Sequence, residues 1–107
     1  MLLLLEDDVE RLERFAAVMR SIAPELPVYI WRDAHAMIRE AGPLLAATSV
    51  ISLDHDLVPE PGAPDPGDGY MVARGLTAQR IVRPVIVHSS NGERSTWMAG
   101  EFDLAEW

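Results

Sequence analysis

Four short apolar segments recur along the chain, and polar residues follow each of them. They cover residues 1–5, 28–31, 50–53 and 85–88. An unbroken apolar run of this length, bounded by acids or turn residues, is typical of a strand buried on both faces of a sheet. The stretches between the segments have helical periodicity, which is clearest over residues 9–22. Strands that alternate with helices in this way predict an α/β fold with a parallel sheet.

Two helices are expected in the first half of the chain. The first covers residues 9–22 and ends before Pro24. Asp33 has the position of an N-cap for the second helix, which Gly42 and Pro43 interrupt. The residues of the second helix that we expect to face inward are Ala34, Met37, Ile38, Ala41 and Leu45.

The second half of the chain contains a long loop and one clear helix. Residues 58–69 are rich in proline and glycine, which predicts a loop that is mobile because it holds little apolar surface. Residues 70–79 form the third helix of the pattern, and Gly75 weakens it. A helical turn over residues 95–99 and an edge strand over residues 102–107 complete the expected elements.

The 107 residues are enough for one domain, so we expect residues 1–107 to form a single unit. The fold class that fits this length is the flavodoxin-like open parallel sheet, with strand order 2-1-3-4-5 and helices on both faces. The last element of this sheet is short or incomplete, because the strand signal is weak after Gly92.

Composition excludes several function classes. The net charge is −8, so unspecific attraction to nucleic acid or to anionic lipid is not expected. The chain has no cysteine, which excludes disulfides and thiol chemistry and fits a cytoplasmic location. The apolar run of residues 1–5 is too short to span a membrane. All nine basic residues are arginines, so the chain contains no lysine.

Acidic and polar residues follow three strands that are neighbours in the expected order. The carboxyl ends of parallel strands form the usual site of such a sheet. Carboxylates gathered there repel one another unless a cation lies among them, and oxygen ligands select Mg²⁺ or Mn²⁺. The predicted metal ligands are Asp7, Asp8, Asp54 and Asp56.

Some of the candidate site residues also have a structural interpretation. Asp7 could cap the first helix, with Glu10 as its reciprocal partner. Asp54 can act as ligand or nucleophile. His88 is the acid/base candidate, although a single histidine at a strand end often has a packing role. Ser89 and Asn91 offer donors to a phosphate, but such residues are also common in turns.

Several blocks resemble receiver domains of two-component response regulators: the acids after the first strand, Asp54, Asp68-Gly69 and Ser89. More specifically, LEDDVER, ISLDHDL, DGYMVARGL and VIVHSSN look like the divergent receiver family named for cyclic-phosphate processing. The resemblance covers about residues 1–92. The matching positions are Asp7, Asp8, Arg11, Asp54, His55, Asp56, His88, Ser89 and Asn91.

The resemblance implies metal-dependent processing of a cyclic phosphate or a related phosphate-ester end, on a phosphorylated small molecule or an RNA end. Asp54 and His88 would be catalytic, and Ser89 and Asn91 would hold the phosphate. Receivers also use a lysine on the phosphate, and this chain has none. The alternatives are a phospho-accepting receiver and a degenerate binding module. The sequence indicates no DNA-binding domain and no particular protein partner.

Overall fold

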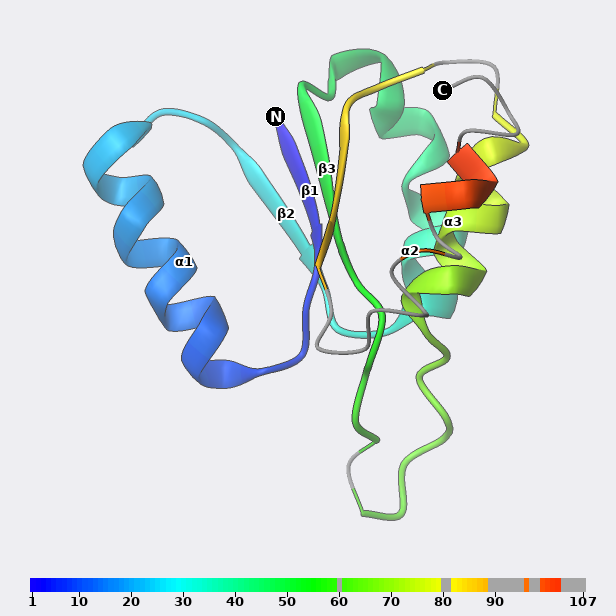
Figure 1. Ribbon diagram of the computed structural model, residues 1–107. Coiled ribbons are helices and arrows are strands. Elements are labelled where there is room, and N and C mark those ends of the chain that lie inside the picture. Colours follow the sequence, from blue (N-terminus) through cyan, green and yellow to red (C-terminus); the bar gives the residue numbers. More distant parts are fainter. Residues whose placement is uncertain (60, 80–81, 89–95, 97–98, 103–107) are drawn as a thin grey trace.

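The computed structural model describes residues 1–59, 61–79, 82–88, 96 and 99–102 (Figure 1). Four parallel strands form one sheet in the order β2-β1-β3-β4. The elements along the chain are β1 (Leu2–Leu5), α1 (Val9–Ile22), β2 (Val28–Trp31), α2 (Ala34–Glu40), the 3-10 helix η1 (Gly42–Ala47), β3 (Val50–Asp54), α3 (Gly69–Thr77) and β4 (Val85–His88). The predicted α/β receiver-like fold is confirmed. The described residues contain no fifth strand, which agrees with the incomplete last element expected from the sequence.

The main core lies between the sheet and the helices α2 and α3, which cover the same face of the sheet (Figure 1). Leu3 and Leu5 of β1 and Ile51 and Leu53 of β3 point toward these helices and are fully buried. Burying an aliphatic side chain of this size stabilises the fold by about 1.5–3 kcal/mol. The helical side chains that complete this core are Met37, Leu45, Val72 and Leu76.

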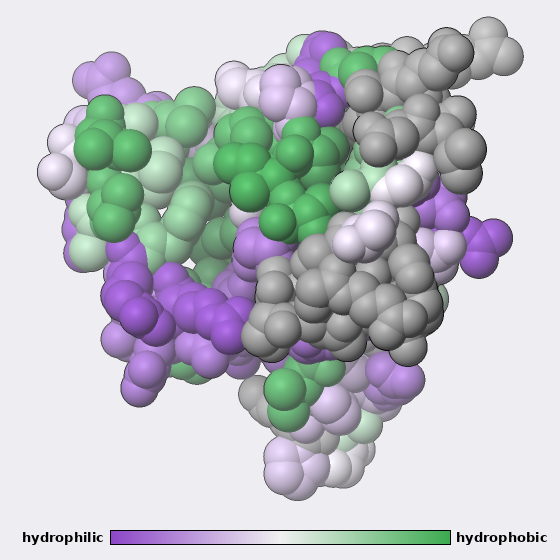
Figure 2. Space-filling view, in the orientation of Figure 1, coloured by the Kyte–Doolittle hydropathy of each residue, from purple (hydrophilic) through white to green (hydrophobic). Residues whose placement is uncertain are grey.

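Helix α1 covers the opposite face of the sheet, and its cover is loose (Figure 1). No residue of α1 is buried, and Ile22 remains 71% exposed. On the same side of the molecule, Ile86 of β4 is 57% exposed. Figure 2 shows hydrophobic side chains at the surface between α1 and β4. The two faces of the sheet are therefore packed very differently.

The second predicted helix is two elements, because Gly42 and Pro43 begin η1 after α2 has ended. Asp33 caps α2 as expected, and its side chain accepts a hydrogen bond from the amide of Ala36 at 2.9 Å. The inward assignment of Ile38 is wrong, because this side chain is 39% exposed. It lies beside Gly75 of α3, where a Cβ atom would come within 3.3 Å of it.

The loop that follows β3 is held at both of its ends. The amide of Val58 donates to the carboxylate of Asp7, and the carbonyl of Pro66 accepts from the amide of Ala34 at 2.7 Å. Gly67 has φ +75° and leads to Asp68, which caps α3. The mobility expected for residues 58–69 stays a prediction.

The end of the chain differs from the sequence-based expectation. Phe102 is buried and helical, so the edge strand predicted for residues 102–107 does not begin there. Residues 103–107 lie outside the described part of the chain, as do Ser89 and Asn91.

Candidate functional site

The register of the sheet places three polar side chains in one row. Leu4 pairs with Ser52, and Ser52 pairs with Ile86, all on the face of the sheet that α1 covers. Because side chains alternate between the faces of a strand, the residues two positions further on share this face. Those residues are Glu6, Asp54 and His88, and the register pairs Asp54 directly with His88.

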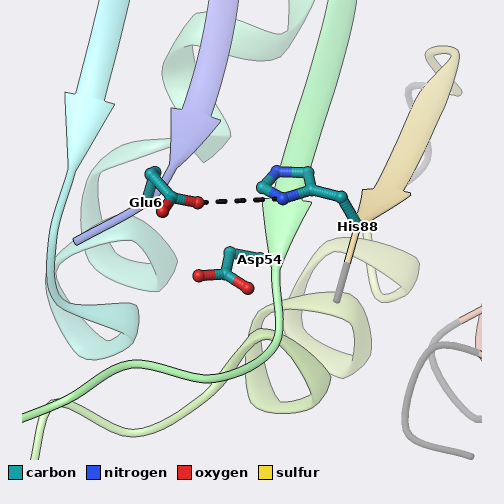
Figure 3. Close-up of side chains that lie close together, drawn as sticks. All are labelled: Glu6, Asp54 and His88. Atoms are coloured by element: carbon teal, nitrogen blue, oxygen red, sulfur yellow. Dashed lines mark ion pairs between the residues drawn. The ribbon is translucent and has the colours of Figure 1, made fainter. Parts of the chain in front are cut away.

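Glu6, Asp54 and His88 point toward one another at the carboxyl ends of β1, β3 and β4 (Figure 3). Each offers one ligand atom, and these three atoms lie within 4.8 Å of one another. One ion pair joins two of these residues, between Glu6 Oε2 and His88 Nδ1 at 3.7 Å. Both carboxylates are buried. We call these three residues the strand-end cluster.

Burial determines the protonation of the strand-end cluster. Burial, together with the nearby Glu6 carboxylate, raises the pKa of the Asp54 carboxyl to about 7. Burial also lowers the pKa of the His88 imidazole, and Glu6 opposes this shift only in part. Without a metal, the cluster therefore carries a proton on Asp54 in part of the molecules at neutral pH, while His88 is mainly neutral.

Arg11, near the start of α1, is the positively charged side chain of the site. Its Nη1 atom lies 3.4 Å from Glu6 Oε1 and 3.7 Å from Asp54 Oδ2. The Arg11 backbone is fixed as well, because its amide donates to the Asp8 side chain at 2.9 Å. One guanidinium thus contacts both buried carboxylates of the cluster.

The carboxylates of the other predicted metal ligands are not part of the strand-end cluster. Asp8 is exposed and caps α1, the role that the capping alternative had given to Asp7. The carboxylate of Asp7 faces the loop and accepts from the amide of Val58. Asp56 is exposed, and its Oδ1 atom lies 2.7 Å from His55 Nδ1. The structure thus brings together two of the predicted site residues, Asp54 and His88, and joins Glu6 to them.

His55 belongs to a second group, on the other side of the strand end. Its ring is buried, and its Nε2 atom lies 3.6 Å from Asp68 Oδ2, at the start of α3. The His55 carbonyl also accepts from the amide of Gly69 at 3.1 Å. His55 therefore joins the end of β3 to the start of α3.

Glu6 is the residue that sequence reasoning left out of the site. The signal for it is the alternation along β1, because Glu6 shares a face with Leu2 and Leu4. The same count along β3 and β4 selects Asp54 and His88. Asp7 falls on the opposite face by this count, where its carboxylate reaches the loop.

The strand-end cluster fits a divalent cation. Glu6 Oε2, Asp54 Oδ2 and His88 Nε2 are buried and accept or donate no hydrogen bond among the residues that the structure describes. Buried polar atoms without partners are costly, and a bound cation would satisfy them. The carboxylates suit Mg²⁺ or Mn²⁺, whereas an imidazole nitrogen favours first-row transition ions over Mg²⁺.

A pocket of about 240 Å³ opens beside the cluster, between α1 and the sheet. It is lined by Leu4, Glu6, Arg11, Phe15, Ser52 and His88. A larger pocket of about 410 Å³ lies along β4 and Phe102. Arg83 is the one charged residue among the described residues that line it, and this side chain donates to the carbonyls of Leu45 and Ala46. Of these two pockets, the smaller one therefore has the side chains suited to catalysis.

Comparison with known families classifies the chain. A model of the family described as the cyclic-phosphate processing receiver domain matches residues 1–103. The chain belongs to this family. The match spans all four strands of the cyclic-phosphate processing receiver domain, including the three that carry the strand-end cluster. No curated protein matches the chain.

Among the described helices of this receiver domain, none is both long and apolar enough to cross a bilayer.

Proposed function

We propose that this receiver domain opens cyclic phosphates, or hydrolyses related phosphate-ester ends, with a divalent cation bound at the strand-end cluster. The observation that carries the proposal is the convergence of Glu6, Asp54 and His88 from three neighbouring strands. The family description supplies the substrate class. A phosphorylated small molecule or an RNA end fits this proposal equally well.

The three cluster residues would have different roles in the reaction. Glu6 and Asp54 would hold the cation, which when bound supplies Lewis-acid stabilisation of a phosphoryl oxygen. Neutral His88 would accept a proton from the water that attacks phosphorus. It would return that proton to the ester oxygen as the phosphorus–oxygen bond of the ring breaks. The product is a phosphomonoester, and no covalent intermediate is required.

The volume of the pocket suits a small part of a substrate rather than a whole drug-sized molecule. Ligand pockets for drug-sized molecules usually have volumes of about 300–1,000 Å³. The pocket beside the cluster, at about 240 Å³, is smaller than that range. A phosphate and the adjacent part of its ester would fill it, and the rest of the substrate would remain outside. Recognition of a phosphorylated end rather than of a whole molecule follows from this size. Ser89 and Asn91 stay predicted phosphate contacts.

The receiver resemblance supports a second function, transfer of a phosphoryl group to Asp54. Asp54 lies at the end of β3 and is the one buried aspartate among the described residues. The missing lysine argues against this switch, because no such side chain can stabilise a phosphorylated state. A degenerate binding module would show neither activity.

Hydrolysis of 2′,3′-cyclic nucleotides tests the proposal. We expect turnover by the wild type with Mn²⁺ or Mg²⁺, and a loss of about 10²- to 10⁴-fold in Asp54→Asn and His88→Ala. His35→Ala is the matched control, since His35 is an exposed histidine of α2. Acetyl phosphate should leave no persistent adduct by mass spectrometry. A stable adduct on Asp54 without turnover would establish the switch instead, and the absence of both would establish a binding module.

A further inference from the structure

Arg11 lines the pocket beside the cluster and contacts two buried carboxylates, Glu6 and Asp54. The Arg11 side chain is 50% exposed, whereas the side chains of Glu6 and Asp54 are 3% and 2% exposed. Both of its carboxylate contacts use the same nitrogen, Nη1. A guanidinium carries five N–H donors in a planar fork. Among the residues that the structure describes, Nη2 and Nε make no hydrogen bond or ion pair.

Two other described arginines donate to backbone carbonyls away from the pocket. Arg32 donates to the carbonyl of Asp7 at 3.1 Å, and Arg83 donates to the carbonyls of Leu45 and Ala46. Arg11 is the one arginine among the described residues that line the pocket beside the cluster. The chain has no lysine, so an arginine is the side chain that can bring a permanent positive charge to an anionic substrate in this pocket.

We propose that Arg11 is the phosphate-binding cation of this site, taking the non-bridging oxygens of the substrate through Nη2 and Nε. Arginine binds phosphate in this bidentate way more readily than lysine does. This inference rests on the proposed function, because it assumes that a phosphate group enters the pocket.

The charges of the site predict how Arg11 affects its two ligands. Ionised Glu6 and Asp54 with Arg11 give the site one net negative charge, and a divalent cation makes it positive. Arg11 therefore repels the metal ion and attracts the phosphate. Replacing Arg11 should shift the two affinities in opposite directions, which the loss of a merely structural contact would not do.

Two titrations of the full chain test this inference. Mn²⁺ is titrated first, and 3′-adenosine monophosphate is then titrated into the Mn²⁺-loaded protein, with adenosine as the phosphate-free probe. In Arg11→Gln we expect the nucleotide to bind about tenfold or more weakly, because a charge-assisted contact is lost. Mn²⁺ should bind at least as tightly as to the wild type. Arg11→Lys should give an intermediate nucleotide affinity, since it keeps the charge and loses the fork.

Arg14→Gln is the matched control, because Arg14 lies on the exposed side of α1 and its Nε atom contacts only the Glu10 carbonyl, at 3.5 Å, among its described hydrogen bonds. It should bind both ligands like the wild type. Wild-type nucleotide affinity in Arg11→Gln, or a joint loss of metal and nucleotide in Arg11→Gln and Arg11→Lys, would overturn the inference. If the nucleotide binds without metal and this binding requires Arg11, the inference about Arg11 holds and the proposed metal-dependent function does not.

Discussion

The carboxylate of Glu6 lies 3.7 Å from the imidazole of His88, although β3 separates their strands in the sheet. This distance is short because both side chains extend across the end of β3, on the side of the sheet that faces α1 (Figure 3). Asp54 lies between them, at the last residue of β3. The site is therefore a property of three strand ends in register.

Metal binding should stabilise the protein through Glu6 and Asp54. A cation present at about 100 times its Kd adds about 2.7 kcal/mol to the free energy of unfolding. For a domain of this size that corresponds to a rise of about 10 °C in Tm. We expect Mn²⁺ to raise the Tm of the wild type but not that of Glu6→Gln or Asp54→Asn, by differential scanning fluorimetry. The double variant Asp7→Asn with Asp8→Asn should keep the rise.

Loss of the rise in that double variant, with the rise intact in Glu6→Gln, would restore the ligand set expected from the sequence. Identical melting of the wild type with Mn²⁺ and with a chelator would exclude a metal site altogether.

His88 should contribute little to the affinity for the cation, because its imidazole nitrogen must stay free to accept a proton. Calorimetric titration should therefore give similar Kd values for Mn²⁺ in the wild type and in His88→Ala. An imidazole nitrogen is a good ligand for a first-row transition ion. A marked loss of Mn²⁺ affinity in His88→Ala would therefore show that His88 is a ligand and not the base.

The stability of the metal-free protein should depend on pH through Asp54. The folded-state pKa of about 7 exceeds the ordinary value of 3.8, so the folded state holds a proton that the unfolded state has lost. The free energy of unfolding should then fall as pH rises from about 4 to 7, by a few kcal/mol. Asp54→Asn removes this pH dependence. The variant should have a larger free energy of unfolding than the wild type at pH 8, and the difference should shrink toward pH 4.

Urea denaturation in the presence of a chelator measures this difference. His88 acts in the opposite sense, since its lowered pKa removes stability as pH falls below 6.5. It is present in both proteins, so the comparison isolates Asp54. A difference between them that does not vary with pH would contradict the buried-carboxyl assignment.

Asp8 should matter for the helix and not for the metal. Its side chain caps α1, and replacing such a cap by alanine costs about 1 kcal/mol, whereas asparagine caps almost as well. Asp8→Ala should therefore lower the free energy of unfolding, and Asp8→Asn should leave it nearly unchanged. Both variants should keep the Mn²⁺-induced rise in Tm; its loss in Asp8→Asn would identify Asp8 as a ligand.

Gly67 should be the sensitive glycine of the long loop. It has φ +75°, and a Cβ atom there would lie 3.0 Å from Met71 Sδ and 3.1 Å from the Ala34 side chain. Gly62 has φ +79° with no atom within 4 Å of the added Cβ, so it serves as a control for backbone strain alone. Both alanine variants should lose about 1 kcal/mol from the left-handed backbone, and Gly67→Ala should lose more. Equal losses in urea denaturation would show that the contact with α2 is unimportant.

The sequence by itself determined the order of strands and helices and the acidic strand ends, because apolar runs, helical periodicity and caps such as Asp33 are local properties. It also excluded lysine and cysteine chemistry. Only the tertiary structure decided which acids meet, because that depends on the register between strands distant in sequence and on the face that each side chain takes. The register of the strands places Glu6 beside Asp54 and His88. The side chain of Asp8 caps α1 and is not part of this cluster. The position of α1 places Arg11 in contact with Asp54.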